Sequence, residues 1–362
     1  MTKLVVVNTA TAVAVIGIIA CTWWIVRTRK PGISGILQRL SALLLGTLLI
    51  VTSTGLMINR QYGFFASVGE MATYFLSGQS SGPQHEATPE LSRWEANPAA
   101  YQLPLKDSDE KEIQEAAFTG PVSGVSDYLR VWKPRDYDPA KGPYDVIVML
   151  PGVPGRASAI QSAIGVQDQV QKAIDDGVMP PTIVVSAGMN IHGKETNCAD
   201  FGGAPRVETW LTDDVPNAIR ANFAVSSDAH DWTIMGVSAG GWCAGRLGLI
   251  HSQVFGRAVS MHGCDKPCSG RMELDADLAH TNSLSTLVKQ PRENPFRLLM
   301  VGSVEDPPTG PEAQAIQSGN PNVAEAKVYP HGGHGWVRWK NEFPDVLAWI
   351  GKQEAATEKR SS

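Results

Sequence analysis

The feature of this 362-residue chain that most directly suggests chemistry is Ser238, which lies between glycines in the stretch TIMGVSAGGWCAG. A GxSxG turn between a strand and a helix keeps the backbone free of side chains, so that a serine hydroxyl projects at the helix N-terminus. The apolar segment WTIM before the turn favours a strand, and residues 240–250 after it favour a helix. We therefore predict that Ser238 is a nucleophile. A small residue in a glycine-rich turn is the alternative.

A nucleophilic serine needs a base that takes its proton and a carboxylate that orients the base. His334, in the glycine-rich stretch YPHGGHGWVRW, is the expected base, and His331 in the same stretch is the alternative. Asp306, which follows an apolar strand in LLMVGSVEDPP, is the expected acid, and its neighbour Glu305 is the alternative acid. The order Ser238, Asp306, His334 is the chain order of the α/β hydrolases.

Acyl transfer places negative charge on the former carbonyl oxygen, which calls for an oxyanion hole of two fixed N–H donors. One is expected from the backbone of Ala239, directly after the nucleophile. The other is expected from the turn PGVPG, where Val153 is the first choice and Gly152 the second, because proline has no N–H. His262 follows the strand next to the nucleophile and is expected to shape the pocket rather than supply the base.

The elements that must position these residues alternate between strands and helices. Strands are expected at residues 112–119, 128–132, 144–150, 182–186, 232–235, 257–261, 296–302 and 326–329, and helices at residues 157–176, 207–222, 240–250 and 341–352. The first two strands are expected to pair antiparallel. This alternation predicts an α/β-hydrolase sandwich, which is a mostly parallel sheet with helices on both faces. Ligands of such sheets bind at the carboxyl ends of the strands.

The N-terminal segment predicts a membrane anchor. Residues 4–26 and 40–59 carry no charge, and each is long enough to cross ~30 Å of hydrocarbon as a helix. Lys and Arg concentrate between them, which places that loop in the cytoplasm. Both termini, and everything after residue 59, are then expected outside the cytoplasm. A signal peptide, or one span with a buried second helix, is the alternative. The expected organisation is a transmembrane hairpin (1–60), a connector (61–105), a hydrolase domain (106–354) and a polar tail (355–362).

Four of the five cysteines fall in the expected outer domain, where an oxidising compartment permits disulfides. We favour Cys198 with Cys243 and Cys264 with Cys268, and the two other pairings stay open. A metal site is not expected, because the chain contains no CxxC sequence and the cysteines have few other ligand-forming residues nearby.

Three stretches carry a resemblance to a known family: VETWLTDDVPNAIRANFAV, IMGVSAGGWCAGRLGLIHSQVFGRAVSMHG and GGHGWVRWKNEFPDVLAWI. They resemble the esterase D-like superfamily of α/β hydrolases, and within it an actinobacterial, membrane-anchored branch related to the antigen 85 mycolyltransferases. The resemblance extends over most of residues 110–352. It implies a serine nucleophile, an acidic residue and a histidine, which match Ser238, Asp306 and His334.

The expected function is that of a membrane-anchored, extracytoplasmic serine esterase or acyltransferase that forms an acyl-enzyme. The expected substrate is an acyl ester, for which an envelope lipid or glycolipid is a candidate, and the expected location is the cell membrane. One alternative is mycolyltransferase-type transfer to trehalose or another envelope acceptor, and another is an envelope scaffold without catalysis. No cofactor is expected. A net charge of −5 without a long basic run argues against a nucleic-acid partner.

Overall fold

A computed structural model of the chain describes residues 17, 23, 24, 27, 33–62, 93–191, 196–267, 270–292 and 294–361. These residues belong to two compact units, Met1–Phe75 and Leu76–Ser362, and each is described by itself. The expected domain boundaries at residues 60, 105 and 354 stay predictions.

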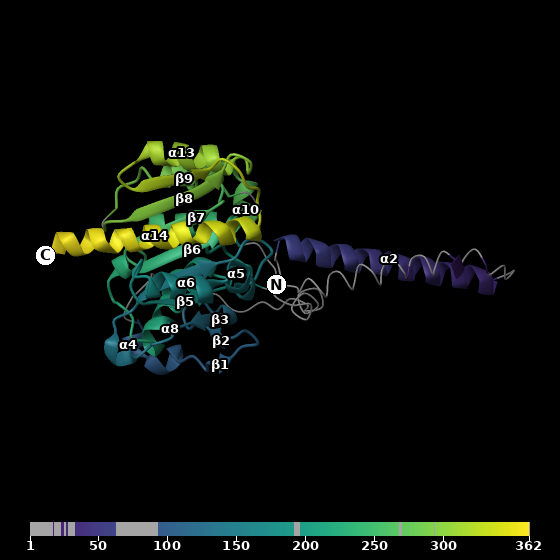
Figure 1. Cartoon of the computed structure of the whole chain (residues 1–362), viewed down its shortest axis with the longest axis horizontal. Helices are drawn as coiled ribbons and strands as arrows, with labels where there is room; N and C mark the ends of the chain where they lie inside the picture. The colour runs from purple at the N-terminus through teal and green to yellow at the C-terminus, as the bar shows by residue number, and fades with distance from the viewer. Residues whose placement is uncertain are drawn as a thin grey trace. The chain divides into compact units, whose positions relative to one another are not determined.

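Helix α2 (Ile33–Tyr62) is the longest described element of the N-terminal unit (Figure 1). Its segment Gly35–Gly55 is apolar enough and long enough to cross a membrane, as judged by length and composition. The second expected span, residues 40–59, falls within this helix. The first, residues 4–26, lies almost entirely outside the described residues, so the two-span hairpin stays a prediction.

The C-terminal unit is built around a nine-stranded sheet with the strand order β1-β2-β3-β5-β4-β6-β7-β8-β9. The strands β1 to β3 and the β3–β5 pair are antiparallel, whereas β4 to β9 run parallel to one another, as expected for an α/β sandwich with an antiparallel edge. The strands are β1 (Lys106–Asp107), β2 (Ile113–Thr119), β3 (Ser126–Trp132), β4 (Asp145–Leu150), β5 (Thr182–Ser186), β6 (Trp232–Val237), β7 (Arg257–Met261), β8 (Arg297–Ser303) and β9 (Ala324–Tyr329).

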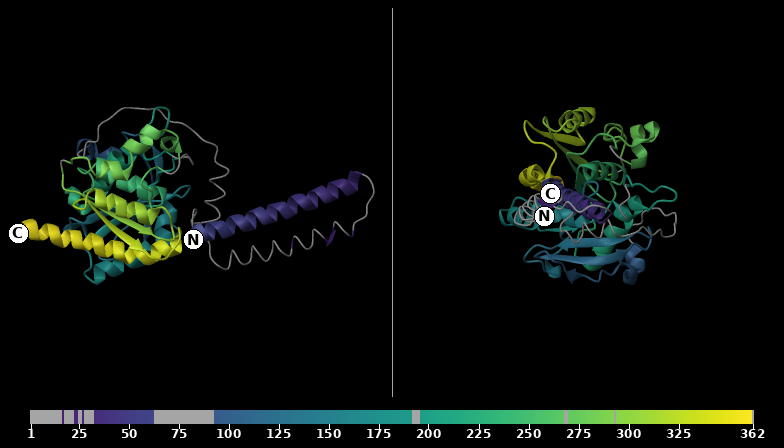
Figure 2. Two further views of the ribbon diagram at one scale, coloured as in Figure 1. Left: turned by 90° about the horizontal axis from the view of Figure 1, so that it is seen from above. Right: turned by 90° about the vertical axis from the view of Figure 1, so that its right-hand side faces the viewer.

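Helices cover both faces of this sheet (Figures 1 and 2). One face carries α5 (Ala157–Ile164), α6 (Val166–Asp175) and α14 (Trp336–Ser361), and the other carries α8 (Val215–Asn222), α9 (Ala239–Ile250) and α13 (Thr309–Gly319). The shorter helices are α4 (Arg93–Ala96), α7 (Val207–Thr209), α10 (Gly270–Glu273), α11 (Ala276–Thr281) and α12 (Leu284–Leu287).

The two faces bury separate hydrophobic cores, because side chains alternate from face to face along a strand. In β4, Val146, Val148 and Leu150 belong to one core, and Ile147 and Met149 belong to the other. All five side chains are buried. The nearly continuous apolar run YDVIVML therefore has a physical cause, since a strand that helices cover on both sides has few solvent-facing positions.

Two of the expected helices differ from the observed ones in their interior. The helix expected at residues 157–176 is two helices, which meet at Gly165 with a φ of 71°, a left-handed conformation that glycine adopts without strain. The helix expected at residues 207–222 contains a π-helical stretch, Trp210–Asp214, between α7 and α8.

Several expected elements differ from the observed ones in their ends, and two of these differences bear on the site and on the expected domain limits. The strand expected to end at Met235 continues to Val237, which brings it directly to Ser238. The closing helix expected at residues 341–352 begins at Trp336 and runs to Ser361, so most of the expected polar tail at residues 355–362 is helical. Its sequence QEAATEKR is rich in good helix formers, which explains the continuation.

Candidate active site

Ser238 occupies the sharp turn between β6 and α9, with φ 57° and ψ −127°. Residues other than glycine rarely adopt such a conformation, and it is typical of functional turns. The neighbouring glycines are required by close backbone approach: a Cβ on Gly236 would lie 2.2 Å from the carbonyl oxygen of Gly240, and a Cβ on Gly240 would lie 2.2 Å from that of Pro151. The two glycines of the GxSxG sequence are therefore required by the backbone packing of this turn.

The backbone of Ser238 is fixed on both sides. Its N–H donates to the carbonyl of Met261 at 2.9 Å, and its own carbonyl accepts from the N–H groups of Gly241 and Trp242 at 2.9 and 3.2 Å. The N–H of Ala239 precedes these two in the first turn of α9, where N–H groups lack intrahelical acceptors. That position, together with the positive end of the helix, suits an oxyanion donor.

The turn that follows β4 lies against the serine. A Cβ on Gly152 would be 3.2 Å from the Cβ of Ser238. The Asn190 side chain holds this turn by donating its Nδ2 hydrogens to the carbonyls of Gly152 (3.1 Å) and Gly155 (3.0 Å). The sequence did not single out Asn190, because its partners are backbone atoms more than thirty residues away. Val153, the expected second donor, belongs to the same turn.

The structure brings Asp306 and His334 together. The Nδ1 atom of His334 lies 2.9 Å from Oδ2 of Asp306, which follows β8, while His334 follows β9. The aspartate is buried and the histidine is partly exposed. Within the described part of the chain, neither Ser238 Oγ nor His334 Nε2 has a hydrogen bond. Catalytic hydrogen bonds often shorten only when substrate is bound.

The alternative acid and base form a separate pair with each other. Glu305 lies 2.9 Å from His331 Nδ1 and accepts a 2.8 Å hydrogen bond from the N–H of Gly332. Both side chains are exposed. These contacts direct Glu305 away from the carboxylate position beside His334.

His262 occupies a position that the sequence did not reveal. Its imidazole is fully buried, with Nδ1 2.6 Å from Asp306 Oδ2 and Nε2 2.8 Å from Glu342 Oε2. Glu342 also accepts a hydrogen bond from Nε of Arg338. The signal that could have drawn attention to Glu342 is the i,i+4 pair of Arg338 and Glu342 in the closing helix.

Burial and hydrogen bonding shift the pKa values of Asp306 and His262 in opposite directions. Burial raises the pKa of Asp306, but hydrogen bonds from His262 and His334 and their charges outweigh it, so this pKa lies well below its usual value. Burial lowers the pKa of His262, yet the hydrogen bonds and charges of Asp306 and Glu342 raise it above its ordinary value. Asp306 is therefore ionised at neutral pH.

One nitrogen each of His262 and His334 and an oxygen of Asp306 lie within 4.8 Å of one another, a grouping that could in principle hold a metal ion. Their N···O separations of 2.6 and 2.9 Å match hydrogen bonds. Two ligands of a tetrahedral zinc ion, each at ~2.0–2.2 Å, would be ~3.3–3.6 Å apart. The geometry fits a hydrogen-bonded network better than a metal site. That the chain binds no metal or cofactor stays a prediction.

The Cys198–Cys243 disulfide attaches helix α9 to the loop that follows β5, and the Cα atoms of the two cysteines are 5.9 Å apart. This pairing was expected and is confirmed. The second expected pair, Cys264 with Cys268, stays a prediction, because Cys268 lies outside the described residues.

The segment VETWLT contributes a second attachment of α9. Arg246 of α9 donates to Glu208 Oε2 at 2.9 Å and to the carbonyl of Cys198 at 3.1 Å, and His251 Nε2 lies 2.8 Å from Glu208 Oε1. Burial raises the pKa of Glu208, but its hydrogen bond with His251 and the charge of Arg246 lower it to about 2. Glu208 is therefore a fixed negative charge that holds α9 through Arg246 and His251.

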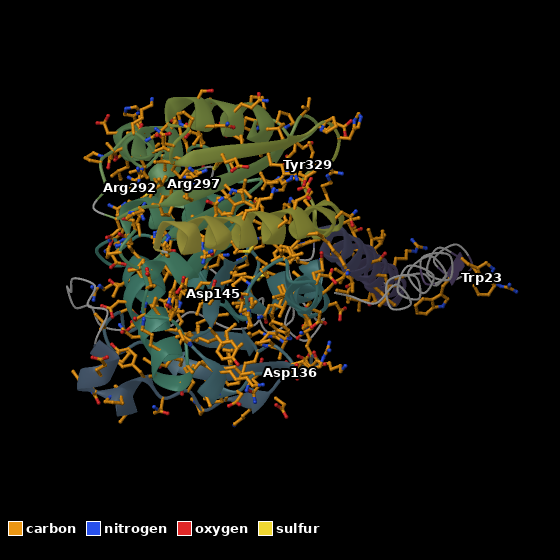
Figure 3. The ribbon with its side chains drawn as sticks, turned by 60° about the vertical axis from the view of Figure 1, so that its left-hand side comes forward. Trp23, Asp136, Asp145, Arg292, Arg297 and Tyr329 are labelled. Carbon is orange, nitrogen blue, oxygen red and sulfur yellow. A yellow bond between two sulfur atoms is a disulfide. The ribbon has the colours of Figure 1, made fainter. Side chains whose placement is uncertain are left out.

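A cavity of 850 Å³ lies at the amino ends of the parallel strands, whereas Ser238 lies at their carboxyl ends. Arg257 and Arg297, the first residues of β7 and β8, line it. Figure 3 shows Arg297 and Arg292 at this edge and Tyr329, the last residue of β9, at the opposite edge. The cavity is therefore separate from the carboxyl ends of the strands, where the candidate triad lies.

Residues 128–350, more than half of the chain, match the protein-family model described as "Putative esterase". The chain belongs to this esterase family. The expected enzyme class, a serine ester hydrolase, and the resemblance to the esterase superfamily are confirmed by this match. The closer relation to the antigen 85 mycolyltransferases stays a prediction.

Several solved structures share the fold. A ferulic acid esterase aligns with a TM-score of 0.57 and 21% identity over 67% of this chain and 98% of its own. An S-formylglutathione hydrolase from Agrobacterium tumefaciens aligns with a TM-score of 0.56 and 13% identity over 69% and 99% of the two chains. The fluorophosphonate-binding serine hydrolase F of Staphylococcus aureus aligns with a TM-score of 0.54 and 15% identity over 66% and 97%.

A curated relative matches a shorter stretch. An uncharacterized protein of Corynebacterium glutamicum is 33% identical over 135 residues, which are 36% of this chain and 31% of that protein. The chain thus spans less than a third of the length of this relative.

Proposed function

We propose that this family member is a membrane-anchored serine esterase or acyltransferase that uses Ser238, His334 and Asp306 as a catalytic triad. The observation that carries the proposal is the Asp306–His334 pair, which lies at the same carboxyl edge of the sheet as the strained turn of Ser238. The names of the structurally similar proteins, an S-formylglutathione hydrolase and a ferulic acid esterase, support acyl esters or thioesters as the substrate class.

In the proposed reaction, Ser238 Oγ attacks the acyl carbonyl while Nε2 of His334 takes the hydroxyl proton. Asp306 holds Nδ1 of His334 and stabilises the imidazolium that forms. The N–H groups of Ala239 and Val153 receive the negative charge of the tetrahedral intermediate. The imidazolium then returns its proton to the leaving alkoxide, which leaves an acyl-enzyme. Water or an acceptor hydroxyl, deprotonated by His334, releases the acyl group.

The membrane anchor and the outer location of the domain are part of the proposal. Helix α2 supports the anchor, because its apolar segment is long enough for a span and its side chains, such as Leu44, are largely exposed. The Cys198–Cys243 disulfide supports an oxidising compartment. A C-terminal fusion to a reporter that is active only outside the cytoplasm should be active, and a cytoplasmic signal would contradict the orientation.

The catalytic proposal is tested on the full chain in detergent, with a short acyl ester as substrate and a fluorophosphonate as active-site label. The Ser238→Ala variant should lose the label and at least about 10³-fold of the hydrolysis rate. His334→Asn should lose a similar factor, whereas the matched control His331→Asn should keep the wild-type rate. A folded Ser238→Ala variant that still reacts with the label would refute the triad.

The same preparation separates hydrolysis from transfer. The acyl-enzyme is common to both, and only the second nucleophile differs. Release of free acid with water alone, unchanged when trehalose or another envelope sugar is added, identifies a hydrolase. Formation of an acylated sugar at the expense of free acid identifies a transferase. A wild-type chain that is folded yet inert to both the ester and the label would favour an envelope scaffold without catalysis.

A further inference from the structure

The imidazole of His262 has two carboxylate partners, of which the proposed triad uses only Asp306. A neutral imidazole has one N–H donor and one acceptor nitrogen, and an ionised carboxylate only accepts. Contacts of 2.6 Å to Asp306 and 2.8 Å to Glu342 are both hydrogen bonds when both ring nitrogens carry protons. The raised pKa of His262 agrees with this protonation. His262 is then an imidazolium, although its side chain is fully buried.

The groups around His262 balance this charge. Asp306 faces it from the turn after β8, Glu342 faces it from α14, and Arg338 of the same helix pairs with Glu342. His334 approaches from the loop before α14, with its ring centroid 6.2 Å from that of His262. Two carboxylates and two cations therefore compensate one another while His334 is neutral. A buried charge is tolerated when it is paired in this way.

The backbone also holds His262 in place. Its φ of 51° lies in the left-handed region, and its N–H donates to the carbonyl of Val301 at 2.7 Å. The same carboxylate oxygen, Oδ2, accepts from both His262 and His334, so that the buried hydrogen bond fixes the oxygen that His334 uses.

We propose that His262 is a positioning residue for the esterase reaction: as a buried imidazolium it fixes the Asp306 carboxylate oxygen that His334 contacts, and its charge sets the acidic limit of activity. The inference rests on the proposed roles of Ser238 and His334. A second positive charge beside an imidazolium is unfavourable, so the charge of His262 opposes the gain of another proton by the site around Asp306 and should extend activity to lower pH.

The first test is the rate of fluorophosphonate labelling of the full chain in detergent across about pH 5 to 9. His262→Asn removes the charge, keeps an amide donor close to the position of Nδ1, and suits a left-handed backbone. The acidic limb of the profile should move to higher pH by about one unit, so that labelling at low pH falls about tenfold relative to the variant's own plateau.

The matched control is His331→Asn, which removes an exposed histidine that also pairs with a carboxylate, Glu305. Its pH profile should coincide with that of the wild type. An acidic limb of folded His262→Asn that coincides with the wild-type limb would overturn the proposal. A uniform loss of rate at every pH, with no movement of the limb, would assign His262 a merely structural role and overturn it as well.

A second measurement needs neither catalysis nor a His262 variant. In the full chain labelled with ¹⁵N-histidine, both ring nitrogens of His262 should carry protons at neutral pH, and Glu342→Gln should lower the pH at which the second proton is lost. A neutral tautomer of His262 in the wild type would refute the imidazolium. If the wild type does not react with the fluorophosphonate, the proposed function fails, and this spectrum alone still decides the charge of His262.

Discussion

The Cys198–Cys243 disulfide allows a quantitative prediction of stability. Both cysteines are completely buried, so the double variant Cys198→Ala/Cys243→Ala removes the bridge without burying a new polar group. The bridge joins the loop after β5 to the middle of α9, which begins directly after Ser238. Removing it changes the entropy of the unfolded chain and leaves the backbone hydrogen bonds of Ser238 in place.

The expected magnitude follows from the length of the closed loop. The two cysteines are 45 residues apart in sequence. The chain-entropy relation for such a loop gives about 4 kcal/mol of stabilisation at 25 °C. In the C-terminal unit, Leu76–Ser362, an unfolding entropy of about 2.1 cal/mol/K per residue makes 1 kcal/mol correspond to about 1.7 °C in Tm, so the double variant should melt about 7 °C below the wild type.

Thermal unfolding monitored by circular dichroism measures this difference. Reductant should lower the Tm of the wild type and should have a much smaller effect on the double variant. Cys21→Ala, a substitution in the N-terminal unit, is the control and should melt with the wild type. A double variant with a Tm within about 2 °C of the wild type would refute the loop-entropy reasoning.

Three further results are expected. The pKa of Glu208 falls from 4.5 to about 2 on folding, so its contribution to the free energy of unfolding is complete above pH 4.5 and is lost as the pH falls toward 2. This contribution is about 3 kcal/mol. Urea unfolding of Glu208→Gln at neutral pH should show the loss, and the stability of the variant should depend less on acidic pH than that of the wild type. Gly152→Ala places a methyl group 3.2 Å from the Cβ of Ser238, and kcat/KM should fall at least about tenfold with little change in Tm. Asp306→Asn should lower kcat about 10⁴-fold, whereas the kcat of Glu305→Gln should stay within about twofold of the wild type. A large loss in Glu305→Gln with little loss in Asp306→Asn would instead identify Glu305 as the acid of the triad.

Much of the fold could be predicted from local patterns. Strands buried on both faces, such as β4, are continuous apolar runs bounded by turns, and the strands at residues 182–186 and 257–261 were predicted with the observed bounds. Irregularities inside the helices were harder to predict. The break at Gly165 and the π-helical stretch Trp210–Asp214 depend on how the helices pack on the sheet, and periodicity alone does not indicate them.

The candidate site also has features that could be predicted from the sequence and features that could not. The turn of Ser238 could be read from its sequence, because Gly236 and Gly240 are required by backbone contacts within a few residues or in the adjacent turn. The sequence favoured Asp306 over Glu305 as the acid but did not exclude Glu305, since both carboxylates follow the same strand. Tertiary contacts favour Asp306: it reaches His334, while Glu305 binds His331.

The sequence by itself determined the strand–turn–helix around Ser238, the order of the candidate triad and the family. These features depend on residue types over short distances, where steric and hydrophobic rules act directly. Only the tertiary structure decided the network of His262, Asp306 and Glu342 and the support of the Gly152 turn by Asn190. Those contacts join residues 38 to 80 positions apart, and the adjacency of parallel strands and the path of α14, rather than any local pattern, bring them together.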